Sequence, residues 1–236
     1  MNGMLPPIER WGGKESEAYR YFANDFLPHR HTEWFSIWQQ AAPIVTLPDV
    51  RSVLEFGGGR DVTRTLSRHF GIEHVSIDAQ DRFYPDAISS ILDYAFDGRV
   101  YDMVCSFECL EHNPFEQLPR LISHMRQFTN RYFYISLPYS GSFLSLSFSL
   151  RLPKFFARKK AYVNSDLMGS PAINVEPIKK RPPERQISAH WWEVGRQGFS
   201  TQRVVKEIEH CGLRLLNKSH NPFDPHHIFL MFEKTT

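Results

Sequence analysis

Cysteine, net charge and long apolar runs are all scarce in this chain of 236 residues. Its three cysteines, Cys105, Cys109 and Cys211, are too few for a disulfide framework, and no two have C-x-x-C spacing. A formal charge of +2 gives no bulk electrostatic reason to bind nucleic acid. No run of about 18 apolar residues occurs, and the first residues lack the layout of a secretory signal. We therefore expect a soluble, cytoplasmic protein with reduced thiols.

Apolar side chains, by contrast, are plentiful. Hydrophobic residues make up 42% of the chain and charged residues 23%, a balance that supports a packed core. Residues 1–49 repeat aromatic side chains at helical spacing, over 14–27 and again around Trp34 and Trp38. We expect a helical lid there, with prolines such as Pro43 ending its helices, because proline cannot continue a helix interior.

From residue 50 onward, strand-like and helix-like patterns alternate. The pattern predicts strands over 51–56, 74–78, 88–92, 101–107, 131–137, 213–219 and 227–233, and helices over 61–70, 115–125 and 200–211. Such alternation is typical of an α/β fold with a Rossmann-like, doubly wound, mostly parallel sheet of seven strands. A short connection joins the last two strands, so we expect them to form a hairpin in which the last strand is antiparallel.

One segment, 138–190, does not follow this rhythm and is expected to be an inserted cap. Serine alternates with Leu or Phe over 144–152, as in a half-buried strand, and 151–185 holds nine Lys or Arg against three Asp or Glu. The predicted organisation is a lid (1–49), a cofactor-binding core (50–137), the cap (138–190) and a closing helix and hairpin (191–236). The basic and aromatic residues of the cap also fit peripheral contact with an anionic membrane.

The chemistry of the core centres on glycines that follow a buried strand. Glu55 precedes Gly57, Gly58 and Gly59, and a helix pattern begins directly after them. Glycines allow a sharp turn and let a ligand approach main-chain N–H groups. Asp78, at the expected end of the second strand, could accept both hydroxyl protons of a ribose.

Folds that bind dinucleotides and folds that bind S-adenosylmethionine share this spacing. A G-x-G-x-x-G fingerprint beginning at Gly57 would need glycine at 62, where the chain has Val62. Glu55 suits a ligand ammonium better than a pyrophosphate. Nicotinamide binding is therefore the weaker interpretation.

The sequence resembles the class I S-adenosylmethionine-dependent methyltransferases. The matching segments are VLEFGGGRD (53–61), SID (76–78), ILD (91–93) and YDMVCSFECLEHNP (101–114). The segment HWWEVGRQGFS (190–200), followed later by NPFDPHHIFL, resembles a bacterial subgroup with an inserted cap. The resemblance implies S-adenosylmethionine as the cofactor and transfer of its methyl group to an oxygen or nitrogen of a small or lipid-linked acceptor.

The resemblance also implies a role for individual residues. The implied cofactor contacts are the methionine portion at Glu55, Gly57, Gly58 and Gly59, the ribose at Asp78, the adenine at Asp93 and Tyr94, and the sulfonium side at Ser106 and Phe107. His112 and His190 are candidate bases for the acceptor, and no metal site is expected.

Structural interpretations of the same residues stay open. The glycines could form only a tight turn, Asp78 could be a solvated strand end, and Asp93 could be a turn former. Glu111 and His112 could simply begin the next helix. The family's third spaced glycine is missing here, which favours the alternative of a non-catalytic scaffold that binds a partner through the basic cap.

Overall fold

The computed structural model describes residues 33–58, 62–141, 143–150, 159–166, 190–221, 223 and 226–235. The helix predicted over 14–27, Gly59 and most of the basic stretch 151–185 lie outside these ranges. Within the described part of the chain, no helix is long and apolar enough to span a bilayer.

A seven-stranded sheet forms the centre of the fold, in the order β3-β2-β1-β4-β5-β9-β8. The strands are β1 (Ser52–Phe56), β2 (Glu73–Asp78), β3 (Ala87–Ile88), β4 (Tyr101–Phe107), β5 (Thr129–Pro138), β8 (Leu213–His220) and β9 (His227–Lys234). Strands β1 to β5 pair in parallel, and β9 is antiparallel to both β5 and β8. The mostly parallel sheet with an antiparallel last strand is thus confirmed. The strand order reverses between β1 and β4, where such sheets bind ligands beyond the strands' carboxyl ends.

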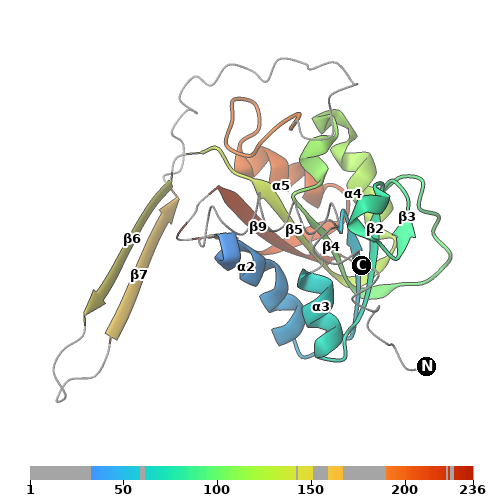
Figure 1. Cartoon of the computed structure of the whole chain (residues 1–236). Coiled ribbons are helices and arrows are strands. Elements are labelled where there is room, and N and C mark those ends of the chain that lie inside the picture. Colours follow the sequence, from blue (N-terminus) through green and yellow to red (C-terminus); the bar gives the residue numbers. More distant parts are fainter. Residues whose placement is uncertain are drawn as a thin grey trace.

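Helices cover both faces of this sheet. They are α2 (Glu33–Thr46), α3 (Val62–His69), α4 (Leu118–Arg126) and α5 (Thr201–Glu209). Contacts join α2 to α3 and α4 to α5, and Figure 1 shows the two pairs on opposite faces. Side chains of one strand alternate between the faces, so Val104 packs in one buried cluster while Met103 packs in the other.

The expectation that Pro43 ends its helix is wrong, because α2 continues through it to Thr46. A proline has no N–H for the carbonyl four residues earlier, which here belongs to Gln39. The hydroxyl of Tyr134 on β5 donates to that carbonyl at 2.7 Å instead. A tertiary hydrogen bond therefore replaces the missing helical one and ties α2 to the sheet.

The third strand is shorter than predicted. Only Ala87–Ile88 pair with β2, and the chain then turns over residues 89–94 rather than continuing to 92. Ser90 explains the early end, because its hydroxyl donates to the Asp93 carboxylate at 2.6 Å and its carbonyl accepts from the Tyr94 N–H at 3.2 Å. Local side-chain bonds of this kind compete with strand pairing.

The insert contains a separate two-stranded antiparallel sheet of β6 (Phe143–Leu150) and β7 (Lys159–Asp166). The strand predicted from the alternation of Ser with Leu or Phe is therefore present. Figure 1 shows this hairpin projecting from the body that contains the main sheet.

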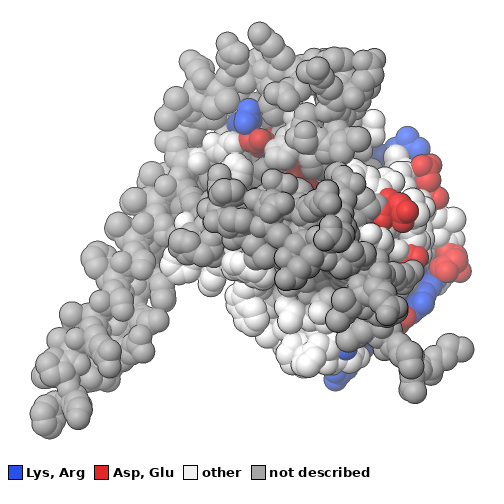
Figure 2. Space-filling model, viewed as in Figure 1, with Lys and Arg blue, Asp and Glu red and all other residues white. Residues whose placement is uncertain are grey.

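Charges of both signs are interspersed on the described surface. In the view of Figure 2, Lys and Arg lie next to Asp and Glu near the β2–β3 edge, and no large field of one sign appears among the described residues.

The bond between Tyr134 and Gln39 generates the first prediction. Tyr134→Phe should lower the free energy of unfolding by about 1–2 kcal/mol, because it leaves a carbonyl without its donor. In a Pro43→Ala background the loss should be much smaller, since residue 43 then supplies its own N–H to Gln39. Urea unfolding of the four proteins in this cycle gives both costs, and an equal cost in both backgrounds would contradict the explanation.

Candidate functional site

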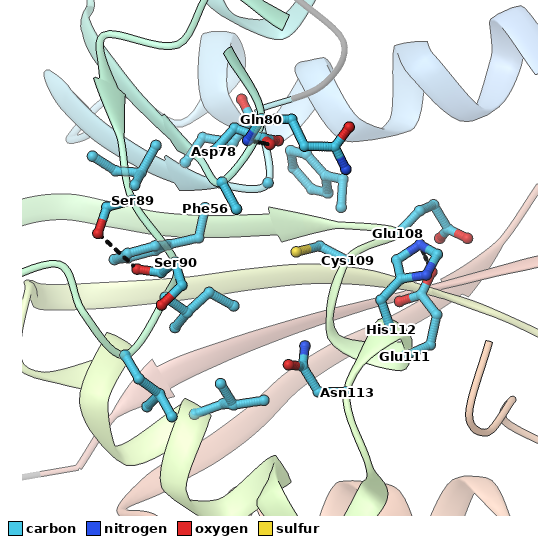
Figure 3. Close-up of a pocket in the computed structure, with 18 of the residues that line it drawn as sticks. Phe56, Asp78, Gln80, Ser89, Ser90, Glu108, Cys109, Glu111, His112 and Asn113 are labelled. Carbon is cyan, nitrogen blue, oxygen red and sulfur yellow. Dashed lines mark hydrogen bonds and ion pairs between the residues drawn. The ribbon is translucent and has the colours of Figure 1, made fainter. Parts of the chain in front are cut away.

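A cavity of about 920 Å³ lies beyond the carboxyl ends of β1, β2 and β4. Its volume is near the upper end of the range of about 300–1,000 Å³ that is common for ligand pockets. Figure 3 shows Asp78 and Gln80 from the end of β2, Ser89 and Ser90 on one side, and Glu108, Glu111 and His112 on the other. The cavity therefore has one end near the β2–β3 connection and another in the segment that follows β4.

The glycine turn after β1 forms part of this cavity, though not as the sequence predicted. Gly57 lines the cavity with φ of +80°, and a Cβ there would lie 2.6 Å from Cys109. A Cβ on Gly58 would lie 2.8 Å from the Cβ of Ser76. The N–H groups of both glycines donate to the Ile77 carbonyl, at 2.8 and 3.3 Å. Chain packing thus favours glycine at both positions, and both N–H groups are used in bonds within the protein.

Glu55 also lines the cavity, and a buried network fixes its carboxylate. Oε2 accepts from the Thr63 hydroxyl at 2.8 Å and lies 2.9 Å from Nε2 of His74. Nδ1 of His74 donates to the Ser67 hydroxyl, at 3.0 Å, because that hydroxyl gives its own proton to the Thr63 carbonyl. The carboxylate is held in place before any ligand binds.

Two more predicted contacts line the cavity, Asp78 at the end of β2 and Asp93 in the turn after β3. Oδ1 of Asp78 accepts from the N–H of Gln80 at 2.8 Å, which orients the carboxylate at the end of β2. Asp93 is exposed and accepts from Ser90, as described above. The two carboxylates thus belong to the same end of the cavity (Figure 3).

The remaining predicted contacts divide between the cavity and the core. Phe107 lines the cavity at the end of β4. Ser106 is fully buried, and neither it nor Tyr94 is among the described residues that line the cavity. The Tyr94 ring packs instead against Phe56 and Phe128, with centroids 6.0 and 5.5 Å apart.

Asp86 supports the connection that frames this end of the cavity. Its carboxylate accepts from the Ser76 N–H at 3.0 Å and pairs with Arg68 at 3.0 Å and with the buried Arg64 at 3.4 Å. Burial opposes ionisation, but these bonds and charges outweigh it and lower the pKa of Asp86. Asp86 is therefore ionised well below neutral pH.

At the opposite end of the cavity lies Glu108, which closes the predicted fourth strand but was not among the predicted cofactor contacts or bases. It follows β4 with φ of +50°, a left-handed conformation that is uncommon for residues other than glycine. Its Oε2 lies 3.5 Å from Nε2 of His227, and Nδ1 of His227 lies 3.1 Å from the Ser36 hydroxyl of α2. Backbone strain of this kind concentrates at functional sites. Its position directly after a strand end was the available signal.

The two candidate bases, His112 and His190, lie side by side although 78 positions separate them in the sequence. Their ring centroids are 5.2 Å apart. Oε1 of the fully buried Glu111 is 4.0 Å from Nε2 of His112 and 3.9 Å from Nε2 of His190. Glu111 and His112 belong to a short 3-10 turn (Leu110–His112) after β4. They therefore do not begin α4, which starts at Leu118.

Glu193 orients the His190 ring through a hydrogen bond to Nδ1. Its Oε1 lies 2.9 Å from Nδ1 of His190, and it also bonds to Ser140 and, at 2.8 Å, to Arg196. Burial opposes ionisation, yet these bonds outweigh it and lower the pKa of Glu193 to about 2. A carboxylate can only accept, so Nδ1 of His190 carries a proton. Nε2 of a neutral His190 then presents its lone pair to the cavity.

Asp86 generates a prediction about pH. Asp86→Asn should destabilise the protein by up to about 3–5 kcal/mol at neutral pH, because the buried Arg64 loses its charged partner. The pKa of Asp86 is lowered in the folded protein, so this stability is present above 3.8, the ordinary pKa of an aspartate, and is lost as the pH falls through the folded value. Unfolding curves of both proteins from pH 7 to pH 2 should therefore converge. The exposed Asp97→Asn is the matched control, and a gap that persists at low pH would contradict the assignment.

Comparisons with known proteins agree with this geometry. A family model described as "Methyltransferase domain" matches residues 26–197. No curated protein matches the chain. An S-adenosylmethionine-dependent methyltransferase from Clostridium acetobutylicum superposes with a TM-score of 0.54 at 10% identity, covering 93% of this chain and 98% of that one.

Two further solved structures have a similar fold. Magnesium protoporphyrin IX methyltransferase from Synechocystis superposes with a TM-score of 0.54 at 12% identity, covering 87% of this chain and 83% of that one. The 1,6-didemethyltoxoflavin-N1-methyltransferase of Burkholderia thailandensis superposes with a TM-score of 0.51 at 11% identity, covering 100% and 94%. The matched family model spans most of the chain, and with the sheet order and the cavity at its switch point it shows that the chain belongs to the methyltransferase-domain family, with the fold of the class I S-adenosylmethionine-dependent enzymes.

Proposed function

We propose that the protein transfers the methyl group of S-adenosylmethionine to an oxygen or nitrogen of a small or lipid-linked acceptor. The observation that carries this proposal is one cavity with two unlike ends. Oriented carboxylates lie near β2 and β3, and two histidines flank a buried glutamate after β4. S-adenosylmethionine, when bound, supplies a methyl group that is already activated on a sulfonium. The chain then has to align the acceptor and receive its proton.

The residues at the first end fit this cofactor. Asp78 has the position and orientation to accept from ribose hydroxyls, and Asp93 lies where it could accept from an adenine amino group. Glu55 and Gly57 lie at the end of β1, on the side assigned to the methionine portion, and Phe107 lies beyond them at the end of β4. Only glycine leaves room at position 57, since a Cβ would meet Cys109.

The residues at the second end fit acceptor activation. Glu193 holds the Nδ1 proton of His190, which leaves Nε2 able to receive a proton from an acceptor hydroxyl or amine. His112 lies beside it and can take part in the same transfer. A base that is oriented by a carboxylate is a recurring arrangement for this chemistry. The pairing of His190 with Glu193 supports catalysis over the scaffold alternative, because a scaffold needs no oriented base.

Two observations support the acceptor class. The toxoflavin-type methyltransferase with a similar fold is named for a small acceptor that it methylates at nitrogen. In this chain, the sequence of β6 alternates Ser with Leu or Phe, which suits an acceptor with an apolar part. The basic segment 151–185 extends this proposal to peripheral contact with anionic lipid.

The cofactor assignment predicts the effect of Asp78→Ala. Calorimetry should show at least tenfold weaker binding of S-adenosylmethionine, about 1.4 kcal/mol, because the ribose hydroxyls lose their acceptor. Asp81→Ala removes the same charge three positions away, at a residue that does not line the cavity, and should bind like the parent protein. Equal affinity of all three proteins would remove the proposed ribose contact.

The acceptor class predicts where a labelled methyl group ends up. With radiolabelled S-adenosylmethionine and a whole-cell extract, label should enter the small-molecule or the lipid fraction. Asp78→Ala should reduce that incorporation when the cofactor is limiting. Label that appears mainly in protein or nucleic acid would overturn the proposed acceptor class, even if cofactor binding is as expected.

A further inference from the structure

We propose that Glu111, His112 and His190 bind a divalent transition cation of the zinc type at the acceptor end of the cavity. Its binding can be tested without any turnover, whereas its role in activating an acceptor rests on the proposed methyl transfer. The site joins the turn that follows β4 to the segment that follows the insert. Neither segment contains a metal-binding motif by itself.

The distances between the donor atoms suit a common ion. One ligand atom from each residue lies within 4.8 Å of the other two, and Oε1 of Glu111 is 4.0 and 3.9 Å from the two Nε2 atoms. Ligands at 2.0–2.2 Å around a tetrahedral ion are about 3.4 Å apart. Side-chain rotations that move each donor atom by less than about 1 Å would complete the site, without any change in the main chain.

The donor types narrow the choice of ion. Two imidazoles and one carboxylate form a set that zinc and neighbouring transition metals bind, whereas calcium and magnesium prefer oxygen ligands alone. Three protein ligands leave at least one position open. The open position is typical of catalytic sites, in which a further ligand comes from solvent or substrate.

The surroundings of His190 are those of a metal ligand. A ligating histidine commonly donates its other ring N–H to a carboxylate, which fixes the tautomer and the ring orientation. Glu193 accepts from Nδ1 of His190 at 2.9 Å, and it is itself held by Ser140 and Arg196. Nε2 is then the atom with which a neutral His190 would bind the metal ion.

The main chain holds these ligands in place. The Trp191 N–H donates to the Glu111 carbonyl at 2.8 Å, so the residue next to His190 is hydrogen-bonded to Glu111 itself. Bound there, the ion would face the acceptor and lower the pKa of a hydroxyl or amine attached to it. His190 would then be a ligand, and the acceptor's proton would pass to solvent.

Metal binding by the full-length protein tests this inference. After treatment with a chelator, the protein is titrated with Zn²⁺ in competition with a chromophoric chelator, and bound zinc is counted by mass spectrometry. We expect one equivalent in the parent protein and at least tenfold weaker binding in His190→Ala. Glu193→Gln keeps the shape but weakens the support of His190, and should cost about 10–100-fold in affinity.

His226→Ala is the matched control, because His226 lines the same cavity outside the three-residue group. It should bind zinc like the parent protein. No retained zinc in the parent protein, or equal affinity in His190→Ala and the parent protein, would overturn the metal site. His190 is partly exposed, so its variant should fold even if a change at the buried Glu111 does not.

Calorimetry with S-adenosylmethionine separates the two proposals. If the protein binds S-adenosylmethionine after chelator treatment but takes up no zinc in the titration, the metal site fails. The dyad of His190 and Glu193 then remains the explanation for acceptor activation. If the protein binds zinc but no S-adenosylmethionine, the metal site stands and the proposed function fails.

Discussion

The hydrogen-bonded stem of the insert is the constraint on which the acceptor end of the site depends. The chain leaves the sheet after β5 and returns at residue 190. At that point the Val194 N–H donates to the Pro138 carbonyl at 3.0 Å, and the Ser140 N–H donates to the Val194 carbonyl at 2.8 Å. These two bonds close the insert at its base. These bonds tie the segment that carries His190 to the end of β5.

Burial reinforces this stem. Trp192 is fully buried, its ring packs against Phe115 with centroids 5.0 Å apart, and its indole N–H donates to the Asn113 carbonyl at 3.0 Å. Burying an indole of this size contributes a few kcal/mol, about as much as several exposed hydrogen bonds. A long loop closed at such a base costs little more entropy than a short one. The stem thus holds the segment that carries His190 next to Glu111.

Sequence patterns predicted the features that depend on local periodicity. Strand ends such as Asp78 and Phe107 were found because buried runs stop at polar or glycine residues, and the carboxyl ends of parallel strands meet at one edge. Pro43 was misread because the donor that replaces its missing N–H is Tyr134, which lies 95 residues from Gln39 in the sequence. The third strand was predicted too long because the pattern does not show that the Ser90 hydroxyl bonds to Asp93 and forms a turn there.

The pairing of Glu111 with His190 was hidden for a related reason, since their proximity depends on the stem of the insert, which leaves no periodic signal. Glu193 was equally hidden, although its i, i+3 spacing from His190 is a weak local clue.

One packing contact connects the two ends of the cavity. Gly57 approaches Cys109 so closely that a Cβ would lie 2.6 Å away, and Cys109 directly precedes the turn that carries Glu111 and His112. Tight packing transmits small displacements, because the interior has few voids to absorb them. This contact therefore joins the end of β1 to the start of the turn after β4, and it gives a physical reason for glycine at position 57 that does not depend on a ligand.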